Sequence, residues 1–168
     1  RCTDRGLGVV MTRYIQLTQG YQAIVDDEDH EELSKFKWHY HLGYAIRTVY
    51  TGGKYIKIRM HRVVMNCPAD KEIDHVDGNK LDNRRCNLRI CTRADNVRNI
   101  QVNTLGKSSK YKGVTWKKQS KKWCAQISLR KKKIYLGLFT DEKSAAIAYN
   151  QAAQKYFGEF ARLNEVQL

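Results

Sequence analysis

The sequence predicts an α+β protein built from two small units. Three observations support this. Short strand-like runs fill the first part of the chain, a turn-rich segment near the middle precedes a helix-start signal, and alternating apolar residues return before an alanine-rich helix. At 168 residues the chain can form two small domains, each near the lower size at which a packed core supports itself. We expect a β-rich N-terminal platform leading to a strand-turn-strand-helix module, then a three-stranded antiparallel sheet packed on one C-terminal helix.

The platform is predicted from short runs rich in β-branched and aromatic residues, which are typical of strands. An acidic stretch from Asp26 to Glu32 predicts a short helix or turn, and we expect Leu33, Phe36 and Trp38 to face a small core. The predicted strands are 14–17, 21–25, 44–47 and 55–58.

The central module is predicted around a turn at Gly78-Asn79. A short helix over 61–66 should end before Pro68, because proline interrupts helical hydrogen bonding. Strands are expected to end at His75 and to return over 87–90. Thr92 and Asp95 have the spacing of a capping box, which predicts a helix running to about Val102.

The C-terminal unit is predicted to have three strands, 112–116, 123–129 and 133–139, followed by a helix that Thr140 caps and Gly158 ends. A polar segment before it is typical of a linker. We therefore expect the platform and central module over 11–103, with the module core at 61–100, a linker over 104–110 and the second domain over 111–168.

The composition indicates an anionic partner. The formal net charge is +14 and the isoelectric point is near 9.7, with most of the excess in residues 107–168. A nucleic acid is one anionic partner that fits this charge. No apolar run approaches the ~18 residues that a membrane span needs, and no leader is visible, so we expect an intracellular protein that is not secreted. Five cysteines without a C-x-x-C pair make structural zinc an unfavoured cofactor.

The central module carries the residue types that phosphodiester cleavage requires. Cleavage needs a base that deprotonates water and positive charge near the leaving oxygen. His75 can act as the base, because an imidazole with a pKa near ~6.5 is mostly uncharged at neutral pH. Asp74 points to the opposite strand face, where Asn96 from the following helix can join it as a metal ligand. Asn87 suits a brace that fixes the hairpin better than a ligand.

Simpler interpretations exist for each of these features. An Asp-His pair in a basic protein is usually a surface feature, and loops rich in asparagine usually only form turns. The joint pattern from Asp74 to Asn96 argues against both, because it combines acid, imidazole and amides at hairpin-plus-helix spacing.

Residues 61–100 resemble an HNH endonuclease module of the ββα-metal (His-Me finger) class, in the branch common in phage and intron-encoded homing endonucleases. The resemblance implies His75 as general base, Asn87 as the middle motif asparagine, and Asp74 with Asn96 as ligands. Many members have histidine where this chain has Asn96. This difference favours a hard metal, one Mg²⁺ or Mn²⁺, over Zn²⁺ or Ni²⁺.

Several basic residues of the module are candidates for contacting DNA. His61 and Arg62 stand where the family often has a basic residue near DNA, although His61 could equally pack in the core. Arg84 and Arg89 belong to the motif region, and we expect them to contact DNA as well.

Residues 109–164 resemble the three-stranded DNA-binding domain of plant ethylene-response factors (APETALA-two type). The matching segments are 111–116, 122–127, 135–139, 145–149 and 161–164. In that family the sheet lies in the major groove. The resemblance therefore implies DNA contacts from Lys112, Thr115, Trp116, Lys118, Trp123, Gln126, Arg130 and Tyr135. Lysine cannot form arginine's bidentate contact to guanine, so the family's target sequence does not transfer.

The leading hypothesis is a homing-type or phage-type DNA endonuclease with one HNH centre and a C-terminal sheet that positions it. A monomer is favoured over a dimer, and a single-strand nick is then the simplest product. The alternative is a non-catalytic, sequence-specific DNA-binding regulator.

Overall fold

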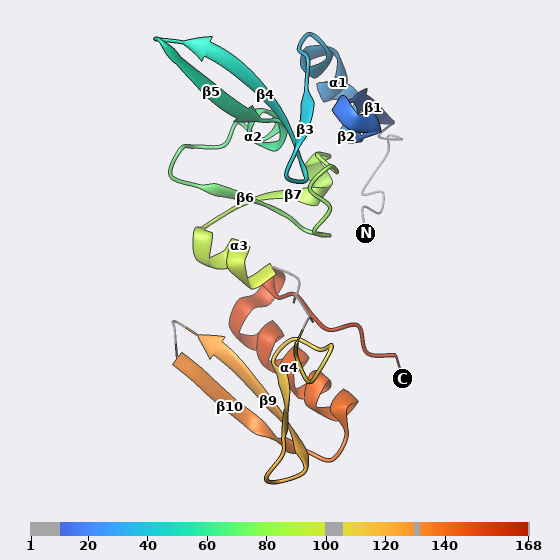
Figure 1. The fold of residues 1–168 in the computed structure, drawn as a ribbon, viewed down its shortest axis with the longest axis vertical. Helices are drawn as coiled ribbons and strands as arrows, with labels where there is room; N and C mark the ends of the chain where they lie inside the picture. The colour runs from blue at the N-terminus through green and yellow to red at the C-terminus, as the bar shows by residue number, and fades with distance from the viewer. Residues whose placement is uncertain (1–10, 100–105, 130–131, 168) are drawn as a thin grey trace. The chain divides into compact units, whose positions relative to one another are not determined.

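The computed structural model describes residues 11–99, 106–129 and 132–167 (Figure 1). The chain divides into two compact units, Arg1–Asn96 and Val97–Leu168. Both mix strands and helices, which confirms the α+β prediction. The predicted linker over 104–110 begins outside the described residues and stays a prediction. Within the described ranges, no helix is long and apolar enough to cross a membrane.

The platform contains two small antiparallel sheets around one core. Strands β1 (Thr12–Gln16) and β2 (Gln22–Asp26) pair, with the 3-10 turn η1 (Thr18–Gly20) between them. Helix α1 (Asp27–Ser34) follows. Strands β3 (His39–His41), β4 (Tyr44–Thr51) and β5 (Lys54–Arg59) form the second sheet in that order, and α2 (Met60–Val64) comes next.

The platform core confirms most of the predicted pattern. The four predicted strands are present with shifted ends, while β3 was not predicted. Leu33 and Trp38 are buried in the core, but the prediction for Phe36 was wrong, because its side chain is 42% exposed. The core also includes Ile73 and Leu88, one from each strand of the central module, so the module is packed onto the platform.

The central module is a strand pair followed by a helix. Strand β6 (Glu72–His75) pairs antiparallel with β7 (Leu88–Cys91), the 3-10 turn η2 (Arg85–Asn87) precedes β7, and α3 (Arg93–Asn99) follows it. The capping box is confirmed: Thr92 Oγ1 accepts from Asp95 N at 3.3 Å, and Asp95 Oδ2 accepts from Thr92 N at 3.4 Å. The predicted helix end at Val102 lies outside the described residues.

The platform fixes the loop between β6 and β7. Ile24 donates its backbone N–H to Leu81 at 2.8 Å and accepts one from Asn83 at 2.7 Å. Asp26 Oδ2 accepts from the backbone N–H of Arg85 at 2.8 Å. These bonds from β2 hold the loop at several points, so the geometry of the hairpin does not depend on its own two strands alone.

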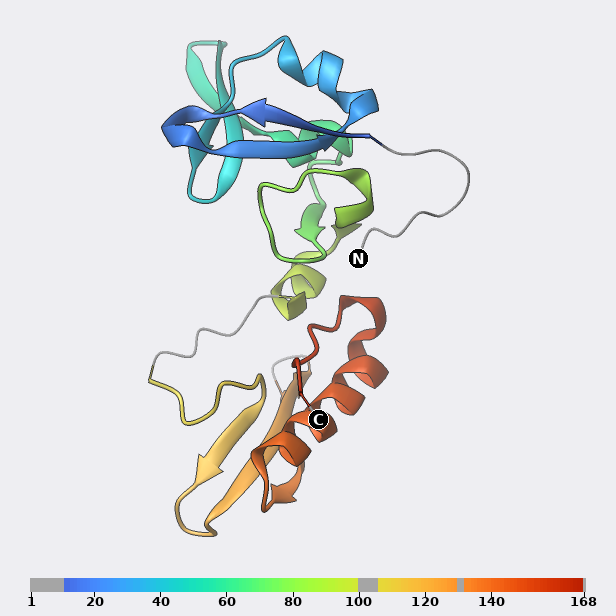
Figure 2. The ribbon, with the colours of Figure 1, turned by 90° about the vertical axis from the view of Figure 1, so that its right-hand side faces the viewer.

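The second unit is a three-stranded antiparallel sheet covered on one face by a helix (Figure 2). Its elements are β8 (Val114–Lys117), β9 (Lys122–Leu129), β10 (Lys132–Phe139), α4 (Glu142–Phe157) and the 3-10 turn η3 (Gly158–Phe160). β9 lies in the centre. Small buried residues of α4, including Ala145, Ala146 and Ala153, allow it to pack closely on the sheet. The predicted cap at Thr140 was wrong by one residue: Asp141 accepts from Ser144 N at 2.7 Å.

Candidate functional site

His75 lies at the end of β6, opposite Leu88, and is 5% exposed. Its ring packs edge-on against His61, with the ring centroids 5.1 Å apart, and is tilted against Tyr44 at 6.2 Å. Burial lowers the pKa of His75 below its ordinary value, although nearby Asp77, Asp74 and Asp82 act in the opposite direction. An imidazole in this environment is uncharged at neutral pH, which is the state that a general base requires.

The ring of Tyr44 lies beside His75 and also contacts two cations, which sequence reasoning missed. The Lys80 Nζ atom lies 4.7 Å from the ring centroid of Tyr44, and the Arg59 guanidinium lies 5.1 Å from it. Both cations are exposed, and they come from the β6–β7 loop and from the end of β5. No spacing in the sequence predicts this convergence, because the three residues belong to separate segments.

His61 packs against the rings of Tyr44 and His75. It is 4% exposed, and burial lowers its pKa to about 3, with the charges of His75, Arg59 and Arg62 acting in the same direction. Its Nδ1 atom is buried and has no hydrogen-bond partner among the residues that the structure describes. A buried, uncharged ring of this kind packs in the core and offers little surface to a phosphate.

Asp74 faces a cation across the hairpin. It pairs in register with Arg89 on β7, and its Oδ2 accepts from Arg89 Nη2 at 2.6 Å and from Nε at 2.9 Å. Both side chains are largely buried. The strand register places the two residues side by side. In this structure the carboxylate of Asp74, the candidate metal ligand, is therefore paired with the guanidinium of Arg89.

Asn96 lies on the same side of β6 as Asp74. Its Nδ2 donates to Glu72 Oε2 at 2.7 Å, and Glu72 and Asp74 share a strand face because they are two residues apart. α3 therefore presents an amide to the carboxylate face of β6, opposite to the His75 face. Carboxylate and amide oxygens are hard donors, and this set fits a magnesium-type ion in its chemistry.

Asn87 ties the loop to the strands. Its Oδ1 accepts from Asp77 N at 3.1 Å, while its Nδ2 donates to Asp77 Oδ1 at 2.9 Å and to the backbone oxygen of Asp82 at 3.0 Å. The side chain is 4% exposed. These three bonds cross the loop that follows His75, so the position of Asn87 is that of a brace.

Two further predicted DNA contacts are engaged within the protein. Arg62 donates to three backbone carbonyls of the turn after α2, at 2.6–3.1 Å. Arg84 forms a bidentate pair with Asp82 at 2.5 and 2.9 Å. Both guanidiniums stabilise loops in this structure.

Three acidic residues of the platform lie close together, and their contacts with an arginine give them a structural role. Among the described residues, Asp26, Glu28 and Asp29 are close enough together to hold a metal ion. Arg85 lies against them: its guanidinium binds Asp29 at 2.7 and 2.9 Å and Glu28 at 2.9 Å. The group anchors η2 to α1, which fixes the start of β7.

The second unit presents a polar face opposite α4. Thr115 pairs with Cys124 across β8 and β9, and Gln126 pairs with Tyr135 across β9 and β10. Strand alternation therefore places Thr115, Gln126 and Tyr135 of the predicted set on one outward face. Tyr135 is 62% exposed. The same alternation adds three lysines that sequence reasoning missed: Lys117, Lys122 and Lys133.

The other members of the predicted set lie elsewhere. Trp116 and Trp123 pair directly across β8 and β9, on the same face as buried Val114, with ring centroids 5.0 Å apart. They are on the core side of the sheet. Lys112 lies in the turn before β8, and Lys118 lies in the turn after it. Arg130 lies outside the described residues.

Comparisons with known proteins agree with both halves of this description. A family model for HNH endonucleases matches residues 60–98. An uncharacterized HNH endonuclease of Acanthamoeba polyphaga mimivirus is 31% identical over 155 residues, covering 88% of this chain and 77% of the relative.

Plant transcription factors match the C-terminal region. An AP2/ERF and B3 domain-containing protein of Oryza sativa subsp. japonica is 46% identical over 57 residues, 34% of this chain and 15% of the relative. An AP2-like ethylene-responsive transcription factor of Arabidopsis thaliana is 35% identical over 89 residues, 45% of this chain and 20% of the relative. No solved structure matches. The match over most of both chains to the mimivirus relative, with the family model over the hairpin and α3, shows that this protein belongs to the HNH endonuclease family.

Proposed function

We propose that the protein nicks double-stranded DNA with His75 as general base and one Mg²⁺ or Mn²⁺ held by Asp74 and Asn96. The observation that carries this proposal is the end of β6, where a buried, uncharged imidazole has the exposed cations Arg59 and Lys80 nearby and is next in the chain to a carboxylate with a neighbouring amide. A monomer with one such centre cuts one strand in a single event. Such an enzyme is expected to act where DNA is found, inside a cell.

His75 takes the proton from the attacking water. Its lowered pKa keeps the imidazole uncharged at neutral pH, and the imidazolium that forms is stabilised by the three acids nearby, Asp74, Asp77 and Asp82. Asn87 contributes by holding Asp77 and the loop in place, so the base keeps its orientation.

A divalent ion at Asp74 and Asn96, when bound, supplies positive charge to the phosphate and to the leaving oxygen. Asp74 and Asn96 would hold it through their oxygens, and the other donors come from water and phosphate. Arg89, which pairs with Asp74 here, must shift or share the carboxylate when the ion binds.

The exposed cations beside Tyr44 are suited to the phosphodiester itself. Arg59 and Lys80 stand on the aromatic ring that packs against His75, so they can bind non-bridging oxygens near the base. Their charge also offsets the repulsion between DNA and the acids of the loop.

The outward face of the C-terminal sheet is proposed to position the enzyme in the major groove. Thr115, Gln126 and Tyr135 offer hydrogen bonds and apolar contact, and the lysines of the same face attract phosphates. Trp116 and Trp123 act by supporting the sheet from its core side.

One observation favours a second candidate, a DNA-binding regulator without catalysis. The carboxylate of Asp74 is already neutralised by Arg89, which a protein that never binds metal could retain as a structural ion pair. Cleavage separates the two candidates. Supercoiled plasmid should be nicked with Mg²⁺ or Mn²⁺ but not with EDTA or by His75→Ala. His30→Ala, which changes a histidine on α1, should nick normally. Binding without nicking in every metal supports the regulator.

A further inference from the structure

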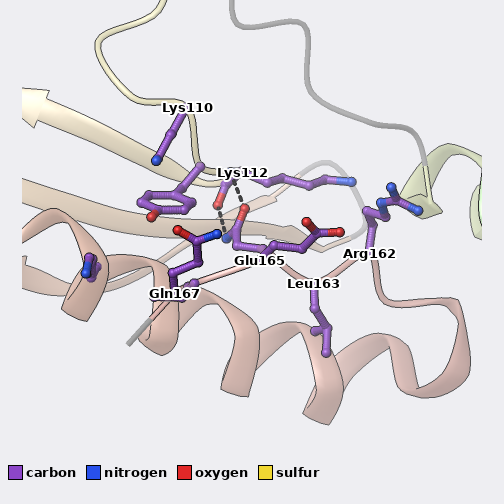
Figure 3. Close-up of a pocket in the computed structure, with 10 residues that line it drawn as sticks. Lys110, Lys112, Arg162, Leu163, Glu165 and Gln167 are labelled. Carbon is purple, nitrogen blue, oxygen red and sulfur yellow. Dashed lines mark hydrogen bonds between the residues drawn. The ribbon is translucent and has the colours of Figure 1, made fainter.

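The second unit contains a cavity of about 500 Å³ at the β8 edge of its sheet. The turn before β8, the start of α4 and the C-terminal tail line it (Figure 3). The cavity is separate from the outward sheet face, because its lining comes from the turns and the tail. The lining residues are Lys110–Lys112, Lys143 and 162–167.

The lining is strongly basic. Four cations, Lys110, Lys112, Lys143 and Arg162, line the cavity together with one acid, Glu165. Lys110 and Lys143 are exposed, and neither forms a salt bridge within the described ranges. Lys112 is half-buried, and burial together with the nearby Arg162 lowers its pKa. The repulsion between Lys112 and Arg162 costs free energy that a bound anion would offset.

The frame of the cavity is fixed by hydrogen bonds rather than by apolar packing alone. Asn164 Oδ1 accepts from Lys112 N at 2.6 Å, and its Nδ2 donates to Lys112 O at 3.1 Å, as the dashed lines in Figure 3 show. Asn150 on α4 binds the backbone of Asn164 at both its N–H and its carbonyl, at 2.7 and 2.9 Å. The tail is therefore held in place before any ligand binds, which reduces the entropy that binding would cost.

We propose that this cavity binds a phosphate of the DNA backbone, outside the region covered by the sheet. The proposal rests on the proposed DNA binding and extends it to a second surface. β8 is an edge strand of four residues, spanning about 13 Å, with the cavity at its start and Lys117 and Lys118 at its end. A duplex along this edge places backbone phosphates near both ends, and the exposed cations Lys110 and Lys143 of the cavity provide the charge to bind one.

The test compares two changes of charge. Lys110→Gln with Lys143→Gln removes two exposed cations of the cavity and leaves the Asn164 bonds intact. Lys155→Gln, near the other end of α4 and outside the cavity, is the control for charge on the same helix. Binding to a random-sequence duplex is measured over a range of salt concentrations. The cavity variant should bind about tenfold more weakly and lose about 0.9 from the salt slope, as one lost phosphate contact implies.

A salt slope equal to that of the wild type overturns the proposal, as does an equal loss in Lys155→Gln. Inorganic phosphate is the second probe. If it raises the Tm of the wild type but not of the cavity variant, while the DNA slope is unchanged, the cavity binds free phosphate and the DNA assignment is wrong. Failure of the nuclease proposal is seen separately, because the wild type would then not nick DNA in any metal while its salt slope for binding stayed the same.

Discussion

The burial of His61 predicts that the first unit loses stability in mild acid. Its pKa is about 3 in the folded protein, against about 6.5 in an unfolded chain. Between these values the unfolded state binds more protons than the folded state, so the free energy of unfolding falls as pH falls. The stability contributed by neutral His61 is complete above pH ~6.5 and is lost progressively towards pH ~3.

The size of the effect follows from the two pKa values. At pH ~5 the unfolded histidine is almost fully protonated while the folded one stays neutral. The difference destabilises the unit by about 2 kcal/mol relative to pH ~8. This is a large share of the stability of a small domain.

Urea unfolding at the two pH values measures the effect. The NMR signal intensities of buried amides in β4, such as those of Ala45 and Ile46, report the unfolding of this unit. His61→Phe keeps a packed ring and cannot titrate, so it should lose about 2 kcal/mol less than the wild type on acidification. His41→Gln, at an exposed position, should behave as the wild type does. Equal losses of free energy in His61→Phe and the wild type would show that the buried imidazole of His61 does not cause the loss of stability in acid.

Three further predictions concern the brace, the second unit and the metal ligand. Asn87→Ala should lower the free energy of unfolding by about 2 kcal/mol in urea denaturation at neutral pH, because it removes three hydrogen bonds, of which the one to the backbone oxygen of Asp82 is buried. An unchanged midpoint would contradict this. Gly113→Ala should cost about 3 kcal/mol, since an added Cβ would lie 2.0 Å from the ring of buried Tyr149 and the φ is +77°. Gly106→Ala, also at positive φ but with open space around it, is the control and should cost about 1 kcal/mol. Asp74→Ala should abolish nicking and change duplex affinity in gel shifts by less than about threefold, because cationic contacts elsewhere supply the affinity. An equal loss of binding would contradict its assignment.

The second unit shows what local patterns can predict. The strand pattern located all three strands, and residues recurring at helical spacing located α4, each to within two residues at the ends that the structure describes. The helix cap was misplaced because Thr140 and Asp141 are both good capping residues, and only the structure shows which one accepts from Ser144. The face of the sheet on which the two tryptophans lie depends on the register between β8 and β9, and composition does not predict that register.

In the first unit, the local elements of the site were predicted and the long-range contacts were not. The turn, the capping box and the adjacency of Asp74 and His75 follow from neighbouring residues. The pairing of Asp74 with Arg89 depends on hairpin register, and the cluster of Tyr44 with Arg59 and Lys80 depends on three segments meeting. β3 was missed because it has only three residues, and its Tyr40 is held by the core and by stacking on Tyr21, a contact between separate segments.

Chemical rescue tests whether His75 removes the proton from the attacking water. His75→Ala protein, shown by NMR to be folded, is incubated with supercoiled plasmid and Mg²⁺ or Mn²⁺, with and without added imidazole. We expect imidazole to restore nicking to His75→Ala in a pH-dependent manner and to restore none to Asp74→Ala. Nicking by His75→Ala at the wild-type rate without imidazole would contradict this role of His75.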